Sequence, residues 1–319
     1  MMRRTALLGG AAALAFLGGG VGWWRSRQSD RLPAGRPPVS AEVFAAAHRA
    51  LPPPEGPMAT YHLGHSLVGR DMPKILAQLA GHSFASQLGW GASLRNHWQG
   101  PEAVNGFEVE NAHADFRPAR EALASGQYDV VVFTEMVELR DAIQWHGSPY
   151  YLAQWANLAK AANPDVRLYL YETWHALDTA DGWETRITRD LPELWEGEVL
   201  RGAMAWEAPA LSLIPGGQVL LAAARAAEAG GLPGLESRRD FFGVSPEGKP
   251  DQIHLSALGS YLIALTHYAV IYQRSPTGLP GRVSLVDQPE LEVPADLAAA
   301  LQRLVWKVVT SVRRTGITG

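Results

Sequence analysis

A continuous apolar run, Val130-Val131-Val132-Phe133, constrains the fold of this chain more than any other feature. A strand that is apolar at every position has both faces buried, which is typical of a parallel sheet covered by helices. Other short apolar runs alternate with helical patterns, which predicts right-handed crossovers around one parallel sheet. The expected strands are 58–63, 84–88, 128–133, 166–171 and 211–214, and the expected helices are 41–50, 72–80, 150–162, 218–229, 255–272 and 297–312.

The N-terminal residues have the pattern of an export segment. Arg3-Arg4 precedes an uncharged stretch from Thr5 to Trp24, and further arginines follow. This stretch just reaches the length needed to span a bilayer, and the arginine pair suggests twin-arginine export. We expect residues 1–27 to be an export signal or a membrane anchor, placing the protein in the periplasm or on the outer side of the cytoplasmic membrane.

The rest of the chain divides into three expected parts. Residues 28–57 are rich in proline and arginine and are interpreted as a linker with one short helix. Residues 58–275 form the expected catalytic domain, and residues 276–319 a C-terminal extension with an amphipathic helix.

Composition excludes several classes of function. The formal net charge of −4 and the scattered basic residues give no electrostatic footprint for nucleic acid. The absence of cysteine excludes disulfides, thiolate metal sites and a cysteine nucleophile.

Two motifs supply the parts of an acyl-transfer site. Gly64-His65-Ser66-Leu67 follows the first expected strand and places a serine at a turn before a helix. Asp251-Gln252-Ile253-His254 precedes the last helix of the expected domain, and its spacing lets one loop deliver a base and the carboxylate that orients it. Each motif alone has an ordinary structural explanation as a turn or a helix cap, but their conjunction is much more specific.

In the order and spacing of these motifs, residues 58–272 resemble the SGNH (GDSL-like) hydrolase family. The resemblance implies a flavodoxin-like three-layer α/β/α sandwich with a parallel sheet of about five strands. It also implies a triad of Ser66, His254 and Asp251 that needs no cofactor and no metal. The oxyanion hole would be formed by the Ser66 and Gly91 N–H groups, with Gly89 as the alternative to Gly91.

The third family block departs from the usual pattern. A glycine–asparagine pair is expected after the 130–133 strand, and Thr134-Glu135 stands there instead. We expect Thr134 to contribute its hydroxyl to the oxyanion hole and Glu135 to bind substrate. Trp90 and Trp174 are further candidates for substrate binding, and Trp98, Trp145 and Glu172 are weaker ones. A metal site at His62, His65, His97 and His113 is an alternative that lacks the usual ligand spacing.

The expected activity is hydrolysis of short acyl esters, above all acetyl esters, on a carbohydrate. Tryptophans after the strand ends offer flat faces for sugar rings, and no long apolar segment that would wall a deep acyl tunnel is present. Two alternatives stay open: a carbohydrate O-acyltransferase with the same triad, and a non-catalytic envelope binding protein of the same fold. The expected partner is a saccharide or small-molecule ester, with membrane attachment through the N-terminal segment as an option.

Overall fold

The computed structural model describes residues 32–245, 248–286 and 288–317. Arg36–Gly319 forms one compact unit. The expected export segment, residues 1–27, lies outside the described residues. Within the described ranges no helix combines the length and the apolar character that a membrane crossing requires.

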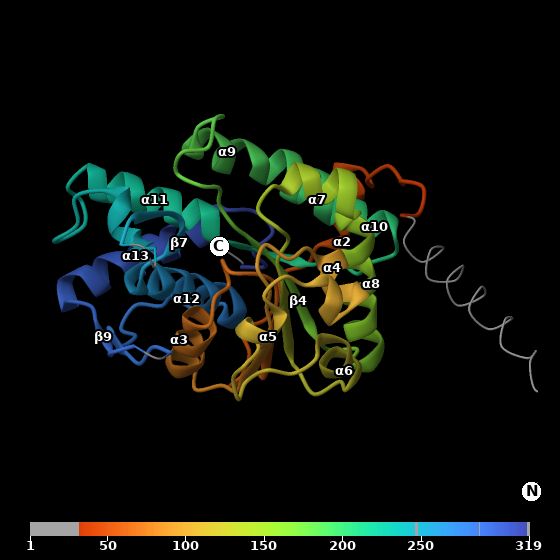
Figure 1. Cartoon of the computed structure of the whole chain (residues 1–319), viewed down its shortest axis with the longest axis horizontal. Coiled ribbons are helices and arrows are strands. Elements are labelled where there is room, and N and C mark those ends of the chain that lie inside the picture. Colours follow the sequence, from red (N-terminus) through yellow and green to blue (C-terminus); the bar gives the residue numbers. More distant parts are fainter. Residues whose placement is uncertain (1–31, 246–247, 287, 318–319) are drawn as a thin grey trace, which may run out of the picture. The chain divides into compact units, whose positions relative to one another are not determined.

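Five parallel strands form the central sheet in the order β2-β1-β3-β4-β5, which confirms the expected fold class (Figure 1). This is the flavodoxin-like order, in which ligands bind where the chain reverses its direction of travel across the sheet, between β1 and β3. The strands are β1 (Thr60–Leu63), β2 (Phe84–Gln87), β3 (Val130–Phe133), β4 (Arg167–Glu172) and β5 (Ser212–Pro215).

The register of the strands brings three loops to one level. Leu63 of β1 pairs with Gln87 of β2 on one side and with Phe133 of β3 on the other. All three strands therefore end together, and the segments that begin at Gly64, Leu88 and Thr134 leave the sheet at the same edge. These segments carry Ser66, the oxyanion candidates Gly89 and Gly91, and the Thr134-Glu135 pair.

Helices cover both faces of the sheet (Figure 1). On one face, α3 and α13 pack against α12, which also contacts α11; on the other, α4, α6 and α10 pack around α8. The first group is α3 (Asp71–Ala80), α11 (Gly216–Glu228), α12 (Ala257–Tyr272) and α13 (Ala295–Ser311), and the second is α4 (Leu94–Gln99), α6 (Ala119–Ala124), α8 (Ser148–Ala162) and α10 (Arg201–Ala205).

The remaining helices, from three to ten residues long, lie in the connections. Sequence patterns gave no element for most of these segments, because short helices lack a clear apolar period. They are α2 (Ala41–Ala47), η1 (Pro101–Ala103), α5 (Phe107–Glu110), α7 (Leu139–His146), α9 (Trp183–Asp190), the π-helical η2 (Leu191–Leu200) and η3 (Arg238–Phe241).

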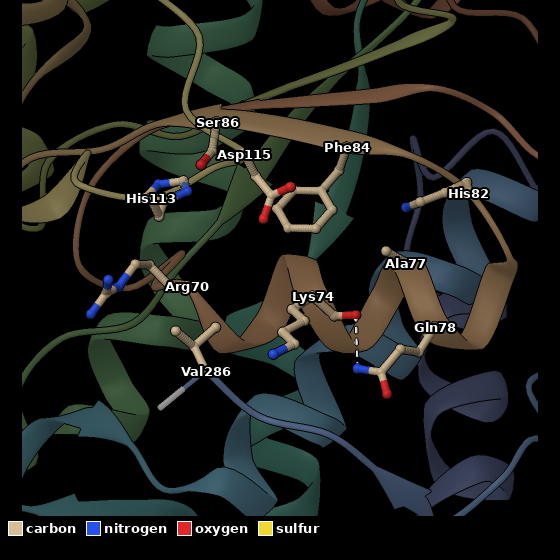
Figure 2. A pocket seen from close by; sticks show the side chains of 10 residues that line it. All are labelled: Arg70, Lys74, Ala77, Gln78, His82, Phe84, Ser86, His113, Asp115 and Val286. Atoms are coloured by element: carbon tan, nitrogen blue, oxygen red, sulfur yellow. Dashed lines mark hydrogen bonds between the residues drawn. The ribbon is translucent and has the colours of Figure 1, made fainter. Parts of the chain in front are cut away.

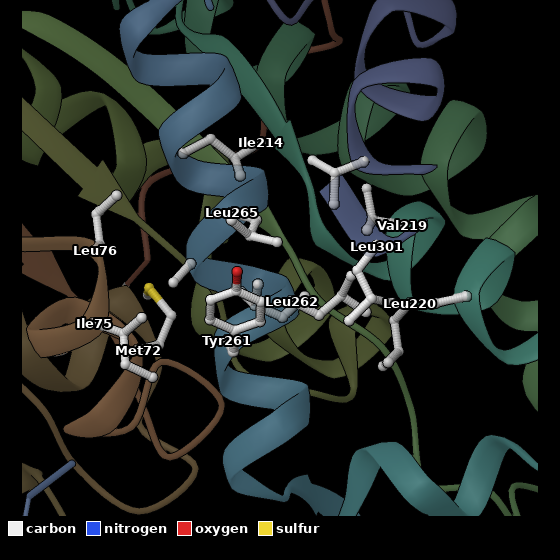
Figure 3. Close-up of a cluster of buried hydrophobic side chains, with 14 of the residues drawn as sticks. Met72, Ile75, Leu76, Ile214, Val219, Leu220, Tyr261, Leu262, Leu265 and Leu301 are labelled. Atoms are coloured by element: carbon white, nitrogen blue, oxygen red, sulfur yellow. The ribbon is translucent and has the colours of Figure 1, made fainter. Parts of the chain in front are cut away.

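The core of one layer is built around α12, which is buried on nearly all sides. A helix that is apolar all round packs inside a protein rather than at its surface. Figure 3 shows side chains of α12 between those of α3 and α11, with Ile214 of β5 and Leu301 of α13 on the same cluster. This packing anchors the helix that directly follows the Asp251–His254 motif.

The structure differs from the expected domain boundaries at both ends. Arg36–Gly319 is one compact unit, so neither residue 57 nor residue 275 separates two bodies. The expected linker packs through buried Phe44, and the Leu51 N–H donates to the Gly316 carbonyl oxygen. The expected amphipathic helix is present as α13, whose buried residues Leu297, Leu301 and Val305 recur every four positions against the core.

Candidate active site

Ser66 lies in the turn that follows β1, at the edge where β1, β2 and β3 end. The Val68 and Gly69 N–H groups both donate to the His65 carbonyl oxygen, at 2.9 and 3.4 Å, which closes this turn around the serine. Gly64 is required by packing, because a Cβ there would lie 2.5 Å from Thr134 Cγ2. The structure thus explains why glycine precedes the nucleophile turn.

The two sequence motifs meet at hydrogen-bonding distance. His254 Nε2 lies 3.0 Å from Ser66 Oγ, and His254 Nδ1 lies 3.0 Å from Asp251 Oδ2. An ionised Asp251 accepts the Nδ1 proton, so Nε2 is left to accept the serine proton. Ser66 and His254 are separated by 188 positions in the sequence, and the fold brings their side chains together.

Asp251 is held in its ionised form by its surroundings. Partial burial acts to raise its pKa, but the His254 and Ile253 N–H groups, each 2.8 Å from Oδ1, and the imidazole together bring the pKa below its usual value. The aspartate therefore stays charged at neutral pH and fixes the orientation of the ring. The motif itself lies on β7 (Pro250–Leu255), which pairs antiparallel with β6 (Phe242–Val244), rather than in the expected loop.

A cavity of about 590 Å³ opens over the serine, and Ser66, Gly69, Trp90, Gly91, Glu110 and His254 line it. Trp90 is 51% exposed, so a large part of its ring faces solvent beside the nucleophile. Its indole N–H donates to Glu110 Oε1 at 2.7 Å, and its ring lies on Gly106, where a Cβ would come within 2.3 Å of the ring atoms. The tryptophan is therefore fixed in position before any ligand binds.

Gly91, rather than Gly89, contributes to this cavity. Gly91 adopts a positive φ of 56° and lines the cavity with Ser66. Gly89 is buried, and a Cβ at that position would lie 2.2 Å from Val104 Cγ1, so its role is packing. Within the described part of the chain, neither the Ser66 N–H nor the Gly91 N–H donates to a protein acceptor, which leaves both available to an oxyanion.

Thr134 does not have the geometry expected of an oxyanion donor. Its side chain is fully buried, and its hydroxyl donates to the Tyr171 carbonyl oxygen at 2.7 Å. The hydroxyl proton is used in this hydrogen bond to β4, and the methyl group packs over Gly64. Thr134 therefore supports the nucleophile turn from behind and does not line the cavity.

Glu135 is likewise not placed to bind substrate, because its side chain is completely buried. Oε1 accepts the Leu94 N–H at 3.1 Å and the Met136 N–H at 2.9 Å, while its main-chain oxygen accepts from His65 Nε2 at 2.7 Å. Burial raises the pKa of Glu135 to about 7 in spite of these donors. The residue ties the nucleophile turn to the start of α4, close to Gly91.

Trp174 is the third expected site residue that the structure moves out of the cavity. Its ring is buried, and its indole N–H donates to the Ile253 carbonyl oxygen at 2.8 Å. The Leu177 N–H donates to the Gln252 carbonyl oxygen at 2.8 Å, and Arg239 reaches Gln252 Oε1 at 3.1 Å. The contacts of Trp174 and Leu177 hold β7 against the segment after β4 and fix the position of His254.

Of the histidines considered as metal ligands, His65 and His97 have hydrogen-bond partners, whereas both ring nitrogens of His62 and Nε2 of His113 have none among the described residues. No cluster of three or more ligand side chains with metal-binding geometry occurs in residues 32–245, 248–286 and 288–317. His97 Nε2 donates to the Gly64 carbonyl oxygen at 2.8 Å, and its Nδ1 accepts from Gln87 at 2.9 Å. His65 Nδ1 accepts the Leu67 N–H. Sequence reasoning missed that His97 and Gln87 clamp the nucleophile turn, since no local pattern links residues so far apart.

The structure also gives the positions of the weaker candidates for substrate binding, Glu172, Trp98 and Trp145. Glu172 is buried and accepts N–H groups of Gly217 and Gln218 at the start of α11, so it caps that helix. Trp98 packs edge-on against Trp155. Trp145 is 61% exposed on α7 and does not belong to the residues that line the serine cavity.

The chain is similar in structure to several known proteins. No family model and no curated protein matches the chain. Among solved structures, it is similar to a putative GDSL-like lipase from Parabacteroides merdae, at 14% identity and a TM-score of 0.43 over 69% of this chain and 97% of that one. It is also similar to phospholipase A1 from Streptomyces albidoflavus, at 15% identity and a TM-score of 0.36 over 64% of this chain and 95% of that one. A Clostridium thermocellum family 3 carbohydrate esterase is similar at 15% identity and a TM-score of 0.31, over 66% of this chain and 93% of that one.

Proposed function

We propose that this chain is a serine ester hydrolase of the SGNH type. The observation that carries the proposal is the continuous hydrogen-bond relay Asp251–His254–Ser66, with both side-chain distances at 3.0 Å, at the edge of the sheet where ligands bind in this strand order. A binding protein that had lost catalysis would have no need to keep this alignment. The relay therefore favours an enzyme over a non-catalytic binder.

The geometry supports a two-step acyl transfer. His254 Nε2 takes the proton as Ser66 Oγ attacks the ester carbonyl carbon, and the Ser66 and Gly91 N–H groups stabilise the negative charge on the carbonyl oxygen. The protonated histidine then gives its proton to the departing alcohol. Water, deprotonated by the same ring, hydrolyses the acyl-serine and restores the free hydroxyl.

The proposed substrate is a short acyl ester, above all an acetyl ester, on a carbohydrate. The support for this choice is Trp90, an exposed indole held rigid beside the nucleophile by Gly106 and Glu110. A flat apolar face with a fixed orientation suits the C–H face of a sugar ring, and ordering it on binding costs little entropy. The carboxylate of Glu110, at the rim of the same cavity, offers an acceptor for sugar hydroxyls.

A fluorophosphonate probe tests the activity directly. Labelling of Ser66 in the wild type, absent in Ser66→Ala, together with hydrolysis of p-nitrophenyl acetate, is the expected result. Chain-length preference on p-nitrophenyl esters, measured beside acetate release from acetylated oligosaccharides, tests the substrate class. Preference for chains of about eight carbons or more without release of acetate from saccharides would overturn the carbohydrate substrate.

We further propose that the protein is exported through residues 1–27 and acts in the periplasm or on the outer face of the cytoplasmic membrane. The support is the Arg3-Arg4 pair and the uncharged stretch from Thr5 to Trp24. Protease treatment of spheroplasts is expected to degrade the catalytic unit. Its full protection, with a cytosolic control protein equally intact, would show that the unit lies on the cytoplasmic side.

A further inference from the structure

A second cavity, of about 430 Å³, lies beside the edge strand β2 (Figure 2). The α3 helix forms one wall and contributes Lys74 and Ala77, with Arg70 directly before the helix, whereas the Phe84 ring projects into the cavity from β2. Asp115 lies beside this ring, on a segment that extends the sheet edge through the hydrogen bond from the Ser86 N–H to the Asp115 carbonyl oxygen. We call this cavity the edge groove.

The edge groove adjoins the serine cavity through two short stretches of chain. Gly69 lines the serine cavity and the next residue, Arg70, lines the groove. Glu110 lines the serine cavity and His113, three residues later, lines the groove. Burial lowers the pKa of His113, and the charges of Asp115, Arg70 and Glu110 act on this imidazole as well. A substrate that extends from Ser66 past Gly69 and Arg70 would reach the groove.

Unpaired nitrogen atoms mark the groove as a polar binding site. His82 is 8% exposed, lies at the end of the groove away from Arg70, and its Nε2 is buried without a partner among the described residues (Figure 2). The Tyr272 hydroxyl accepts the Met58 N–H at 3.1 Å and lies 2.8 Å from His82 Nδ1. In the tautomer in which this hydroxyl donates to Nδ1, the neutral ring carries its proton on Nε2, which is then a donor.

The groove offers donors and an acceptor around one aromatic ring. Arg70, Lys74 and His82 are donors that line it, and Lys74 Nζ already donates to the Leu285 carbonyl oxygen at 2.7 Å. The carboxylate of Asp115 accepts and would repel an anion. Hydroxyl groups both donate and accept, so a neutral polyhydroxylated ring can satisfy both kinds of side chain. Its apolar C–H face can rest on Phe84, as aromatic side chains bind apolar surface while polar neighbours fix the orientation.

We propose that the edge groove is a second sugar subsite of the same enzyme, which makes the substrate an acetylated oligosaccharide rather than a monosaccharide. This inference rests on the proposed esterase function. It predicts that catalytic efficiency rises with the number of sugar rings until the groove is filled. The small ester p-nitrophenyl acetate occupies the serine cavity alone and does not depend on the groove.

The test begins with acetylated xylo-, gluco-, manno- and chito-oligosaccharides of one to four units, and proceeds with the series that releases acetate fastest. Ala77→Phe fills the groove from the outer side of α3, and Asp115→Ala removes the acceptor from an exposed loop. Each hydrogen bond lost to a neutral ligand corresponds to about a threefold to tenfold loss in kcat/KM. Ala161→Phe, at an exposed position of α8 on the opposite face of the sheet, is the matched control.

The expected result is that Ala77→Phe reduces kcat/KM for the longer substrates about tenfold or more, to the value for the single ring, and Asp115→Ala reduces it about threefold to tenfold. Both variants keep wild-type turnover of p-nitrophenyl acetate. Equal efficiency for one and four rings, or losses no larger than in Ala161→Phe, would overturn the second subsite and leave the esterase intact. Absence of p-nitrophenyl acetate hydrolysis in the wild type would instead overturn the proposed activity.

Discussion

The two sides of the Ser66–His254 hydrogen bond are supported in different ways. The serine side is a turn clamped from within the core, where His97 holds Gly64 and Glu135 holds His65. The histidine side is a two-stranded hairpin near the surface, and the His254 side chain is 48% exposed. Its main anchors are the Trp174 indole and the packed helix α12 that follows.

From this difference we infer that the position of Ser66 depends on the global stability of the fold, whereas the position of His254 depends on local contacts. Buried hydrogen bonds to the main chain around Ser66 cannot break without exposing unpaired polar groups in the core. Contacts at the hairpin can break at lower cost because solvent can replace them. Variants on the two sides are therefore expected to separate activity from stability.

The largest effect is expected from removing the nucleophile or the base. Ser66→Ala and His254→Ala should each lower kcat for p-nitrophenyl acetate about 10⁴-fold or more, since triad residues act as a unit. Neither side chain contributes much to packing, so the melting temperature should change little in both. Wild-type turnover in the purified Ser66→Ala protein would refute the assignment of the nucleophile.

The pH dependence of stability tests the buried clamp. Burial lowers the pKa of His65, His82, His97 and His267 to about 4. Between about pH 6.5 and 4 the unfolded chain binds protons at these groups, whereas the folded chain does not. The free energy of unfolding that these neutral histidines support above pH 6.5 is therefore lost as the pH falls toward 4.

Two buried glutamates act in the opposite direction. Burial raises the pKa of Glu135 to about 7 and of Glu172 to about 8, so the stability they contribute below pH 4.5 is lost as the pH rises through these values. Because the histidines outnumber the glutamates, the free energy of unfolding should fall by a net amount on the order of 4 kcal/mol as the pH drops from 6.5 to 4.5. Urea denaturation across pH 4.5–8 should show a maximum near neutrality. Glu135→Gln should flatten the alkaline side, and an unchanged profile would contradict the buried titration of Glu135.

His97→Leu should damage activity and stability together. The substitution leaves the Gly64 carbonyl oxygen and the Gln87 amide unpaired in the core, at a cost of about 2–4 kcal/mol. A displaced nucleophile turn should also lower kcat about 10²-fold. Urea midpoints and p-nitrophenyl acetate kinetics of the same preparation measure both effects, and loss of one without the other would show that the clamp is not shared.

Trp174→Phe is the matched change on the hairpin side. The ring is largely kept and only the hydrogen bond to the Ile253 carbonyl oxygen is lost, so the free energy of unfolding should fall by about 1 kcal/mol. A less firmly held His254 should lower kcat about tenfold, with KM nearly unchanged. A stability loss as large as that of His97→Leu would remove the contrast between the two sides.

The smallest effect is expected from Thr134→Val. An oxyanion donor would cost about 10²–10³ in kcat when removed, whereas a hydroxyl bonded to the Tyr171 carbonyl oxygen should cost about threefold or less. The unfolding free energy should fall by about 1 kcal/mol because one buried hydrogen bond is lost. A 100-fold loss of kcat at unchanged stability would return Thr134 to the oxyanion hole.

The sequence by itself determined the layered fold and the three residues of the relay. Apolar periodicity is a local property, and the runs that begin near 58, 84, 130, 166 and 211 became the five strands. The Asp251–His254 spacing and the Ser66 turn are local as well, so each motif was visible without the fold. The resemblance that joined them predicted an alignment that the structure shows at 3.0 Å.

Only the tertiary structure decided what the neighbours of those residues do. Whether Thr134, Glu135 and Trp174 face a cavity or the core depends on which strands and helices lie across from them, and that information is spread over distant parts of the chain. The same holds for His97 on Gly64 and for the edge groove, whose walls come from α3, β2 and the loop at Asp115. Side-chain type specifies what a residue is able to do, but burial and long-range hydrogen bonding select which of those chemistries it performs.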